Sequence, residues 1–152
     1  MSSIARIAYA VAASCLAAGL LIADAAAATQ VAQVKDVAGA AFIVRDGQRM
    51  AAKQGDPLYE KDVLQTDADG TIGATFTDNT MMSLGPNSEA AIAQYVFDSS
   101  NFKGAMETDM NKGTLSMVSG DIARSSPGAM KVRTPTAILG VRGTSFVVEV
   151  NK

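Results

Sequence analysis

The residue types that most often carry out chemistry are nearly missing from this chain. Its 152 residues contain no histidine and one cysteine, Cys15. Without histidine the sequence lacks the commonest general base and the commonest metal ligand. A serine nucleophile of the hydrolase type would need a G-x-S-x-G box, which the sequence does not contain. We therefore expect no enzymatic activity and no cofactor.

Two patterns resemble parts of metal sites. Asp67-Ala68-Asp69-Gly70 lacks the third ligand before the glycine and the later glutamate of an EF-hand, so we interpret it as a hairpin turn. Met106 and Met110 form an M-x-x-x-M pair of thioethers, which suit Cu(I). They stand in a polar stretch, residues 98–112, that predicts an exposed loop or a long hairpin connection. We expect the methionines to fill irregular gaps in a core, and we predict no metal.

The densest pattern is KVRTPTAILGVRGTSFVVEV, residues 131–150. Thr134-Pro135-Thr136 predicts a turn or a crossing at a sheet edge, because proline fixes φ and donates no hydrogen bond. Gly140 and Gly143 flank Val141-Arg142 as points of unusual backbone freedom. Beyond them Phe146, Val148 and Val150 alternate with Ser145, Val147 and Glu149, which predicts a half-buried closing strand with Phe146 in the core.

Arg133 and Arg142 are open to two interpretations. They form a basic edge that faces a partner, since arginine is enriched at interface anchors. Alternatively, Arg142 donates to backbone carbonyls at a strand crossing, where Gly140 and Gly143 allow a close approach. We favour the structural role, because a motif shared across a fold more often encodes the fold than one partner.

These residues require an all-β domain to position them. Short alternating runs recur between turn signals such as Asp46-Gly47, Asn111-Lys112-Gly113 and Ser125-Ser126-Pro127-Gly128. We predict a β-solenoid-like or sandwich-like stack of short strands in a single domain. The runs are residues 31–34, 41–45, 71–77, 81–84, 90–92, 115–118 and 144–150.

The N-terminal segment as far as Ala28 predicts a secretory signal peptide. Arg6 precedes an apolar run from Ile7 to Ile22, and small residues end at Ala28. We therefore divide the chain into a signal peptide, residues 1–28, and an all-β domain, residues 29–152, located in the periplasm. An uncleaved membrane anchor and a lipoprotein acylated at Cys15 are the minority alternatives. With 13 Lys and Arg against 15 Asp and Glu, the chain also lacks the basic excess of a nucleic-acid binder.

The pattern V-R-T-P-x-A-x-x-G-V-R-G-T-x-F closely resembles the C-terminal signature of the FecR domain, the periplasmic module of iron-dicitrate sensor regulators. Upstream, Gly55-Asp56-Pro57-Leu58 resembles the family's G-D-x-L turn, and Asp78-Asn79-Thr80 stands where the family usually has Asp-Gly-Ser. The resemblance covers about residues 37–150. The signature residues, with a structural or partner-binding role, are Arg133, Thr134, Pro135, Ala137, Gly140, Val141, Arg142, Gly143, Thr144 and Phe146.

The resemblance implies an exported, non-enzymatic interaction or sensory module that binds another protein or an envelope component. The alternative is a structural envelope scaffold that self-associates into a homo-oligomer through an open sheet edge. Only Met1–Ala5 precede Arg6, so we expect no cytoplasmic regulator segment and no control of a sigma factor. We likewise expect no further C-terminal domain after Val150, and no small-molecule substrate.

Overall fold

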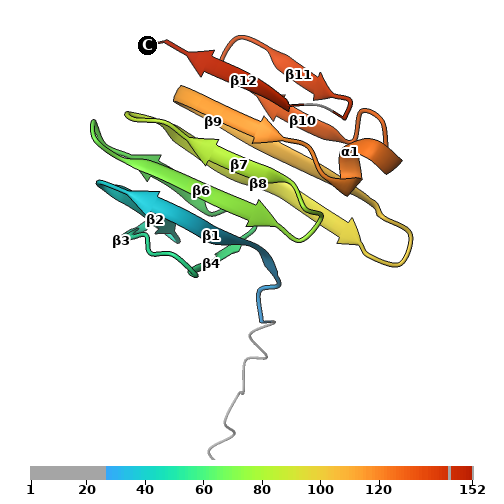
Figure 1. Ribbon diagram of the computed structural model, residues 1–152, viewed down its shortest axis with the longest axis horizontal. Coiled ribbons are helices and arrows are strands. Elements are labelled where there is room, and N and C mark those ends of the chain that lie inside the picture. Colours follow the sequence, from blue (N-terminus) through green and yellow to red (C-terminus); the bar gives the residue numbers. More distant parts are fainter. Residues whose placement is uncertain (1–26, 144, 152) are drawn as a thin grey trace, which may run out of the picture.

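A computed structural model describes residues 27–143 and 145–151 of the chain (Figure 1). Nearly all of the regular structure is strand. The elements are β1 (Gln30–Ala38), β2 (Ala41–Arg45), β3 (Gln48–Ala51), β4 (Pro57–Tyr59), β5 (Val63–Thr66), β6 (Thr71–Phe76), β7 (Met81–Leu84), β8 (Glu89–Asp98), β9 (Lys103–Val118), α1 (Asp121–Ser125), β10 (Met130–Arg133), β11 (Ile138–Val141) and β12 (Ser145–Val150). The predicted all-β, single-domain class is confirmed.

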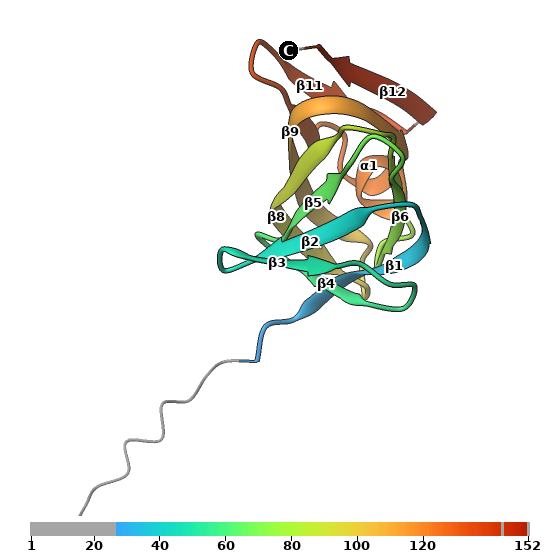
Figure 2. The ribbon, with the colours of Figure 1, turned by 90° about the vertical axis from the view of Figure 1, so that its left-hand side faces the viewer.

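The strands form one curled sheet whose two halves face each other across the core (Figure 2). One half, here called the β6 half, has the order β4-β1-β6-β7-β9-β12. The other, the β8 half, has the order β3-β2-β5-β8-β9-β10-β11. Every pairing is antiparallel except that between β9 and β10, which is parallel.

Strand β9 belongs to both halves because it bends at Gly113. Its first part pairs with β8 and β10, and its last residues pair with β7 and β12. Gly113 has a φ of +86°, and a Cβ there would lie 2.5 Å from Ser88 Cα. Only glycine fits that backbone conformation and that close approach.

The chain crosses between the halves at corners that stack on one another. The Asp67 backbone N–H donates to Ala40 O at 3.0 Å, and the Asn87 N–H donates to Asp67 O at 3.0 Å. The Gly85 N–H then donates to Thr114 O at 3.0 Å. Each corner therefore supports the next, so β1 with β2, β6 with β5 and β7 with β8 form successive layers of a solenoid-like stack.

The Asp67–Gly70 turn has a different place from the one predicted. The Gly70 N–H donates to Asp67 O at 3.0 Å, so the turn itself is present. It does not close a hairpin, however, because β5 pairs with β2 and β8 whereas β6 pairs with β1 and β7. Asp-Gly sets the local turn, and it does not decide whether the flanking strands pair or pass to opposite halves.

Inward-facing apolar rows run across each half and fill the space between them. In the β6 half, Ile72, Leu84, Leu115 and Val148 are register neighbours and all are buried. A slip of one residue would expose the whole row, so the alternation seen in the sequence specifies this register. Burying each such side chain contributes about 1.5–3 kcal/mol.

The polar stretch 98–112 is not the predicted loop. β8 continues to Asp98, a tight connection follows, and β9 begins at Lys103. Met106, Thr108 and Met110 face the core while Glu107 and Asp109 are half-buried on the other face. The charged residues occupy only alternate positions, and the strand is amphipathic because methionine and threonine occupy the others. The prediction that these methionines fill the core is confirmed.

The predicted signal peptide, residues 1–28, and Cys15 lie outside the described residues except for Ala27 and Ala28. Within the part of the chain that the structure does describe, no helix has the length and apolarity needed to cross a membrane.

Candidate functional site

The signature residues lie at one end of the stack, where both halves finish in an edge strand (Figure 1). Among the described residues, β11 pairs only with β10, and β12 pairs only with β9. Each strand therefore has one free edge of backbone N–H and C=O groups. Unpaired edges of this kind are templates for another strand.

Arg133 holds β10 to the neighbouring strand. Its guanidinium forms an ion pair with Glu107 and lies 3.8 Å, Nε to Oδ1, from Asp109. Both acids are on β9, which runs parallel to β10. Arg133 is thus engaged within the sheet, which agrees with the structural interpretation for this residue.

The Thr134–Ala137 turn joins β10 to β11. The Thr134 N–H donates to Ala137 O at 2.8 Å, and the Ala137 N–H donates to Thr134 Oγ1 at 3.0 Å. Pro135 and Thr136 form the exposed tip, where the missing N–H of proline costs no ladder bond. The sequence therefore located this turn correctly.

The two signature glycines differ in what they do. Gly143 has a φ of +51°, a conformation that favours glycine, at the link between β11 and β12. Gly140 does not have a positive φ, and a Cβ there would meet nothing within 4 Å. The expectation of unusual backbone freedom therefore holds for Gly143 and is wrong for Gly140, which is an ordinary position of an edge strand.

Arg142 lacks the role first favoured for it. Among residues 27–143 and 145–151, its guanidinium forms no hydrogen bond and no ion pair, and its side chain is exposed. No backbone crosses closely at Gly140 or Gly143. Thr144, the next signature residue but one, lies outside the described residues. Within the described part of the chain, Arg142 is thus a cation without a partner, beside two open edges.

A groove of about 250 Å³ lies between β11 and β12. Val141 is buried in it, Leu139 is 39% exposed, and Phe146 is half-buried at the margin of the core. The lining residues are Leu139, Gly140, Val141, Arg142, Phe146, Val147 and Val148. Phe146 was predicted to lie in the core. It lies at the edge of the core instead, where its side chain contacts both the core and the groove.

Two apolar side chains are exposed at this end. Val147 is 66% exposed, as its place on the outward face of the closing strand predicted, whereas the sequence analysis did not predict Ile138, which is 64% exposed. The signal for β11 was present, since Ile138-Leu139 stand between a turn and Gly140, but four residues are too few to show a period.

The opposite end of the stack is protected. The free edges there belong to β3 and β4. On β3, Arg49 stacks 3.4 Å above the Phe42 ring and pairs with Asp67. Strand β4 is three residues long and starts with Pro57. Short strands, proline and charge all discourage edge pairing. The two ends of the sheet therefore differ in their capacity to accept a strand.

An ion pair further stabilises the protected end. Asp62 is 1% exposed and accepts from Arg45 Nε at 2.8 Å and Nη2 at 2.7 Å. The hydrogen bond to Asp62 raises the pKa of Arg45, whereas burial acts in the opposite direction. Arg45 also lies 4.4 Å above the Tyr59 ring, so this corner is tied together by one guanidinium.

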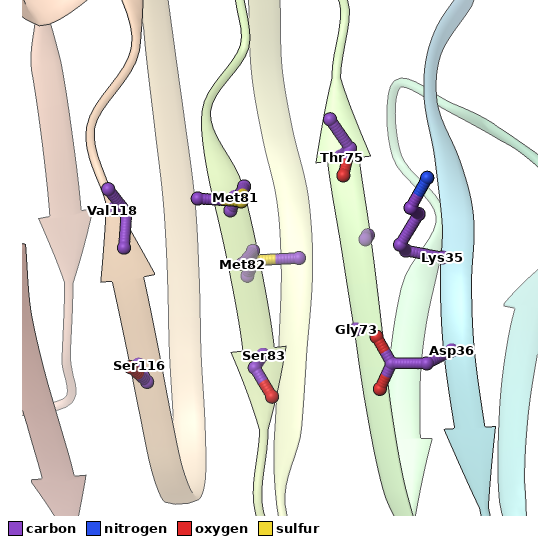
Figure 3. A pocket seen from close by; sticks show the side chains of 10 residues that line it. Lys35, Asp36, Gly73, Thr75, Met81, Met82, Ser83, Ser116 and Val118 are labelled. Carbon is purple, nitrogen blue, oxygen red and sulfur yellow. The ribbon is translucent and has the colours of Figure 1, made fainter.

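Another hollow, of about 230 Å³, lies on the outer face of the β6 half (Figure 3). It exists because Gly73, Ser83 and Ser116 present small groups there, and Lys35, Asp36 and Met81 rise around them. Its central strands β6 and β7 have both edges paired, so the floor of the hollow offers no free strand edge to a ligand. Across the described residues, no group of three or more Asp or Glu side chains lies close enough to hold a metal ion.

Comparison with known protein families places the open end within a family match. The family model described as FecR protein matches residues 62–152, which include the open end and all of the signature. Neither the curated proteins nor the solved structures gave a match.

Proposed function

The chain belongs to the FecR family, and from that premise we propose that it is an exported, non-enzymatic module that binds another protein or an envelope component through the open end of its sheet. The family is one of periplasmic regulatory and sensory modules, which supports a role in recognition. The observation that carries the proposal is that, among the described residues, β11 and β12 each leave one edge unpaired beside a largely apolar groove.

Several features of this end suit a binding surface better than a structural one. Ile138 and Val147 expose more than half of their side chains, while the opposite end is protected by Arg49 and Pro57. An apolar edge left open costs solubility, and natural sheets usually avoid it. Its presence at one end only favours a surface that a partner covers.

Capture from the cell envelope tests the proposal. The tagged full chain, its Leu139→Lys variant and its Met50→Lys variant are each cross-linked in cells, and the captured proteins are identified by mass spectrometry. Met50 on β3 is 40% exposed, against 39% for Leu139, so the two substitutions place a lysine at similar exposure on opposite ends.

We expect the wild type and Met50→Lys to capture the same component, and Leu139→Lys to lose it while its urea midpoint stays unchanged. Capture of the same component by all three chains, or no reproducible capture by the wild type, contradicts the proposal.

Export is tested separately by the intact mass of the protein recovered from the periplasm. We expect a chain that starts after Ala28, as Arg6, the apolar run and the small residues predict. A chain that retains Met1, or one that begins at an acylated Cys15, contradicts a soluble periplasmic form.

A further inference from the structure

The β8 half extends one strand further beyond β9 than the β6 half does. In the β8 half, β10 and then β11 follow β9, whereas in the β6 half only β12 follows it. β12 stands opposite β10, since each pairs with its own part of β9. Across the groove β11 meets β12, and within the described residues no strand of the β6 half lies beyond β12.

The apolar rows of the core continue as far as this step. In the β8 half, Met106, Met130 and Val141 are register neighbours and all are buried. The next row ends at Leu139, beside Val132, and Leu139 keeps 39% of its surface exposed. A strand alongside β12 would cover Leu139 with its inward side chains.

Opposite charges lie near the two ends of β12. Arg142 is the only charged residue among those that line it, and it lies where β11 leads into β12. A second hollow, of about 330 Å³, adjoins the far end of β12 and contains Glu149 together with the Thr134–Thr136 tip. A segment in the groove therefore meets a cation at one end and an anion at the other.

We propose that the free edge of β12, opposite β11, binds an extended segment of another protein whose alternate residues are apolar and whose carboxylate lies at Arg142. The backbone of the segment pairs with β12, its inward side chains cover Leu139 and Val141, and Arg142 pairs with the acid. This inference rests on the proposed function and names the chemistry of the partner.

A second copy of this chain fits the groove less well. A symmetric antiparallel contact between two β12 edges would bring Arg142 of each copy toward the Glu149 end of the other, and Glu149 lines the second hollow rather than the groove. A head-to-tail contact would use the β3 and β4 edge, which Arg49 and Pro57 protect. We therefore assign the groove to an acidic segment of another protein, and the sedimentation measurement below separates that occupant from a second copy.

Peptide selection against the immobilised full chain tests this inference. A displayed library of random octapeptides is panned on the wild type, on Arg142→Glu and on Lys53→Glu. Lys53 is exposed on the β3–β4 connection at the protected end, so its substitution makes the same change of charge away from the groove. Selected peptides are then synthesised with and without a central proline.

We expect the wild type and Lys53→Glu to select alternating apolar residues with an Asp or Glu toward one end, and Arg142→Glu to select Lys or Arg at that position. A central proline should weaken binding at least about tenfold, because it removes a donor to the ladder.

An empty selection, or a charge preference that Arg142→Glu does not change, overturns the inference. So does a concentration-dependent dimer in sedimentation that Leu139→Lys dissolves, since the occupant is then a second copy. If the envelope component is still captured in the first two cases, the proposed function stands and only the assignment of the segment fails.

Discussion

Tyr95 and Asp78 are joined by two hydrogen bonds that connect the halves of the sheet. The Asp78 backbone N–H donates to Tyr95 Oη at 2.9 Å, and Tyr95 Oη lies 3.1 Å from the Asp78 carboxylate Oδ1, to which it donates. The same carboxylate accepts from Thr80 Oγ1 at 2.7 Å and from the Ile122 N–H at 3.3 Å. The β6–β7 turn, β8 and α1 are therefore fixed by one buried acid.

The Tyr95 hydroxyl gives the stability of the fold a dependence on alkaline pH. Burial, followed by the nearby Asp78 charge, raises the pKa of Tyr95 well above its ordinary value. The unfolded chain ionises near pH 10 while the folded chain keeps the proton, so this contribution is complete below pH 10 and is lost as the pH rises further. We expect the free energy of unfolding to fall by at most about 1.4 kcal/mol per pH unit from this group.

Urea unfolding of the wild type and Tyr95→Phe between pH 8 and pH 11 measures that loss. Tyr95→Phe should be less stable by about 1–3 kcal/mol at pH 8, because Asp78 loses two partners, and its decline above pH 10 should be shallower. If the free energy of unfolding falls with pH equally in the two chains, then Tyr95 has the same pKa in the folded and unfolded states, and the prediction is wrong.

Two buried threonines should respond in opposite ways to replacement by valine. Thr108 and Thr80 are both 0% exposed. Among the described residues, Thr108 Oγ1 has no hydrogen-bond partner, whereas Thr80 Oγ1 donates to Asp78 and accepts from the Gly120 N–H at 3.0 Å. Thr108→Val should stabilise the fold by about 1 kcal/mol, and Thr80→Val should destabilise it by about 1–3 kcal/mol. Equal effects in urea unfolding would contradict the assigned geometry.

Gly113, at the bend of β9, and Gly143, at the link between β11 and β12, both have a positive φ. They should nevertheless differ in how well they tolerate replacement by alanine. In Gly113→Ala the new Cβ clashes with Ser88 and the Asn87 carbonyl. Backbone strain adds to that clash, so we expect a loss of about 3 kcal/mol or more. A Cβ at Gly143 meets nothing within 4 Å. Only the backbone strain of about 1–2 kcal/mol therefore remains in Gly143→Ala.

Thermal unfolding of both glycine variants is sufficient to separate the two cases. A larger loss at Gly143 than at Gly113 would show that the link packs more tightly than described.

Phe146→Ala should cost less than the removal of a fully buried phenylalanine. The side chain is half-buried where β12 borders the groove. We therefore expect a loss of about 2 kcal/mol, below the roughly 3–5 kcal/mol typical of a protein core. Val147 is exposed on the same strand, so Val147→Ala is the control. The control should be neutral within about 0.5 kcal/mol, as surface substitutions usually are. A neutral Phe146→Ala in urea unfolding would mean that β12 does not contact the core.

The sequence predicted the elements whose residues alternate strictly, and it failed where the pattern was short or mixed. Ile72, Ala74 and Phe76 identify β6, and Asn79, where the family usually has glycine, takes a left-handed turn conformation with φ 64°. The first part of β9 was missed because its charges hide an alternation that Met106 and Met110 complete. Which half each strand joins depends on pairings far apart in the chain, and no local pattern encodes them.

The candidate site was predicted in part. The signature coincides with the open end of the sheet and predicted the Thr134–Ala137 turn, but it could not show that, among the described residues, β11 and β12 each lack a second neighbour. An edge is unpaired when no other strand lies beside it, and residues 131–150 alone do not determine where the other strands lie. Arg142 was first interpreted as a structural donor, and its lack of a partner among the described residues became visible only once the surrounding backbone was placed.

The double membership of β9 sets the order in which the fold can form. After Asp98 the chain has made β7 and β8, whose outer edges both wait for the same sixteen-residue strand. Neither edge is covered until residues 103–118 are present, and then both are covered together. Pairing of this kind joins distant segments late, which slows folding and leaves partly folded chains prone to aggregation. A nascent chain cut short before Lys103 should therefore be a substrate for chaperones rather than a folded fragment.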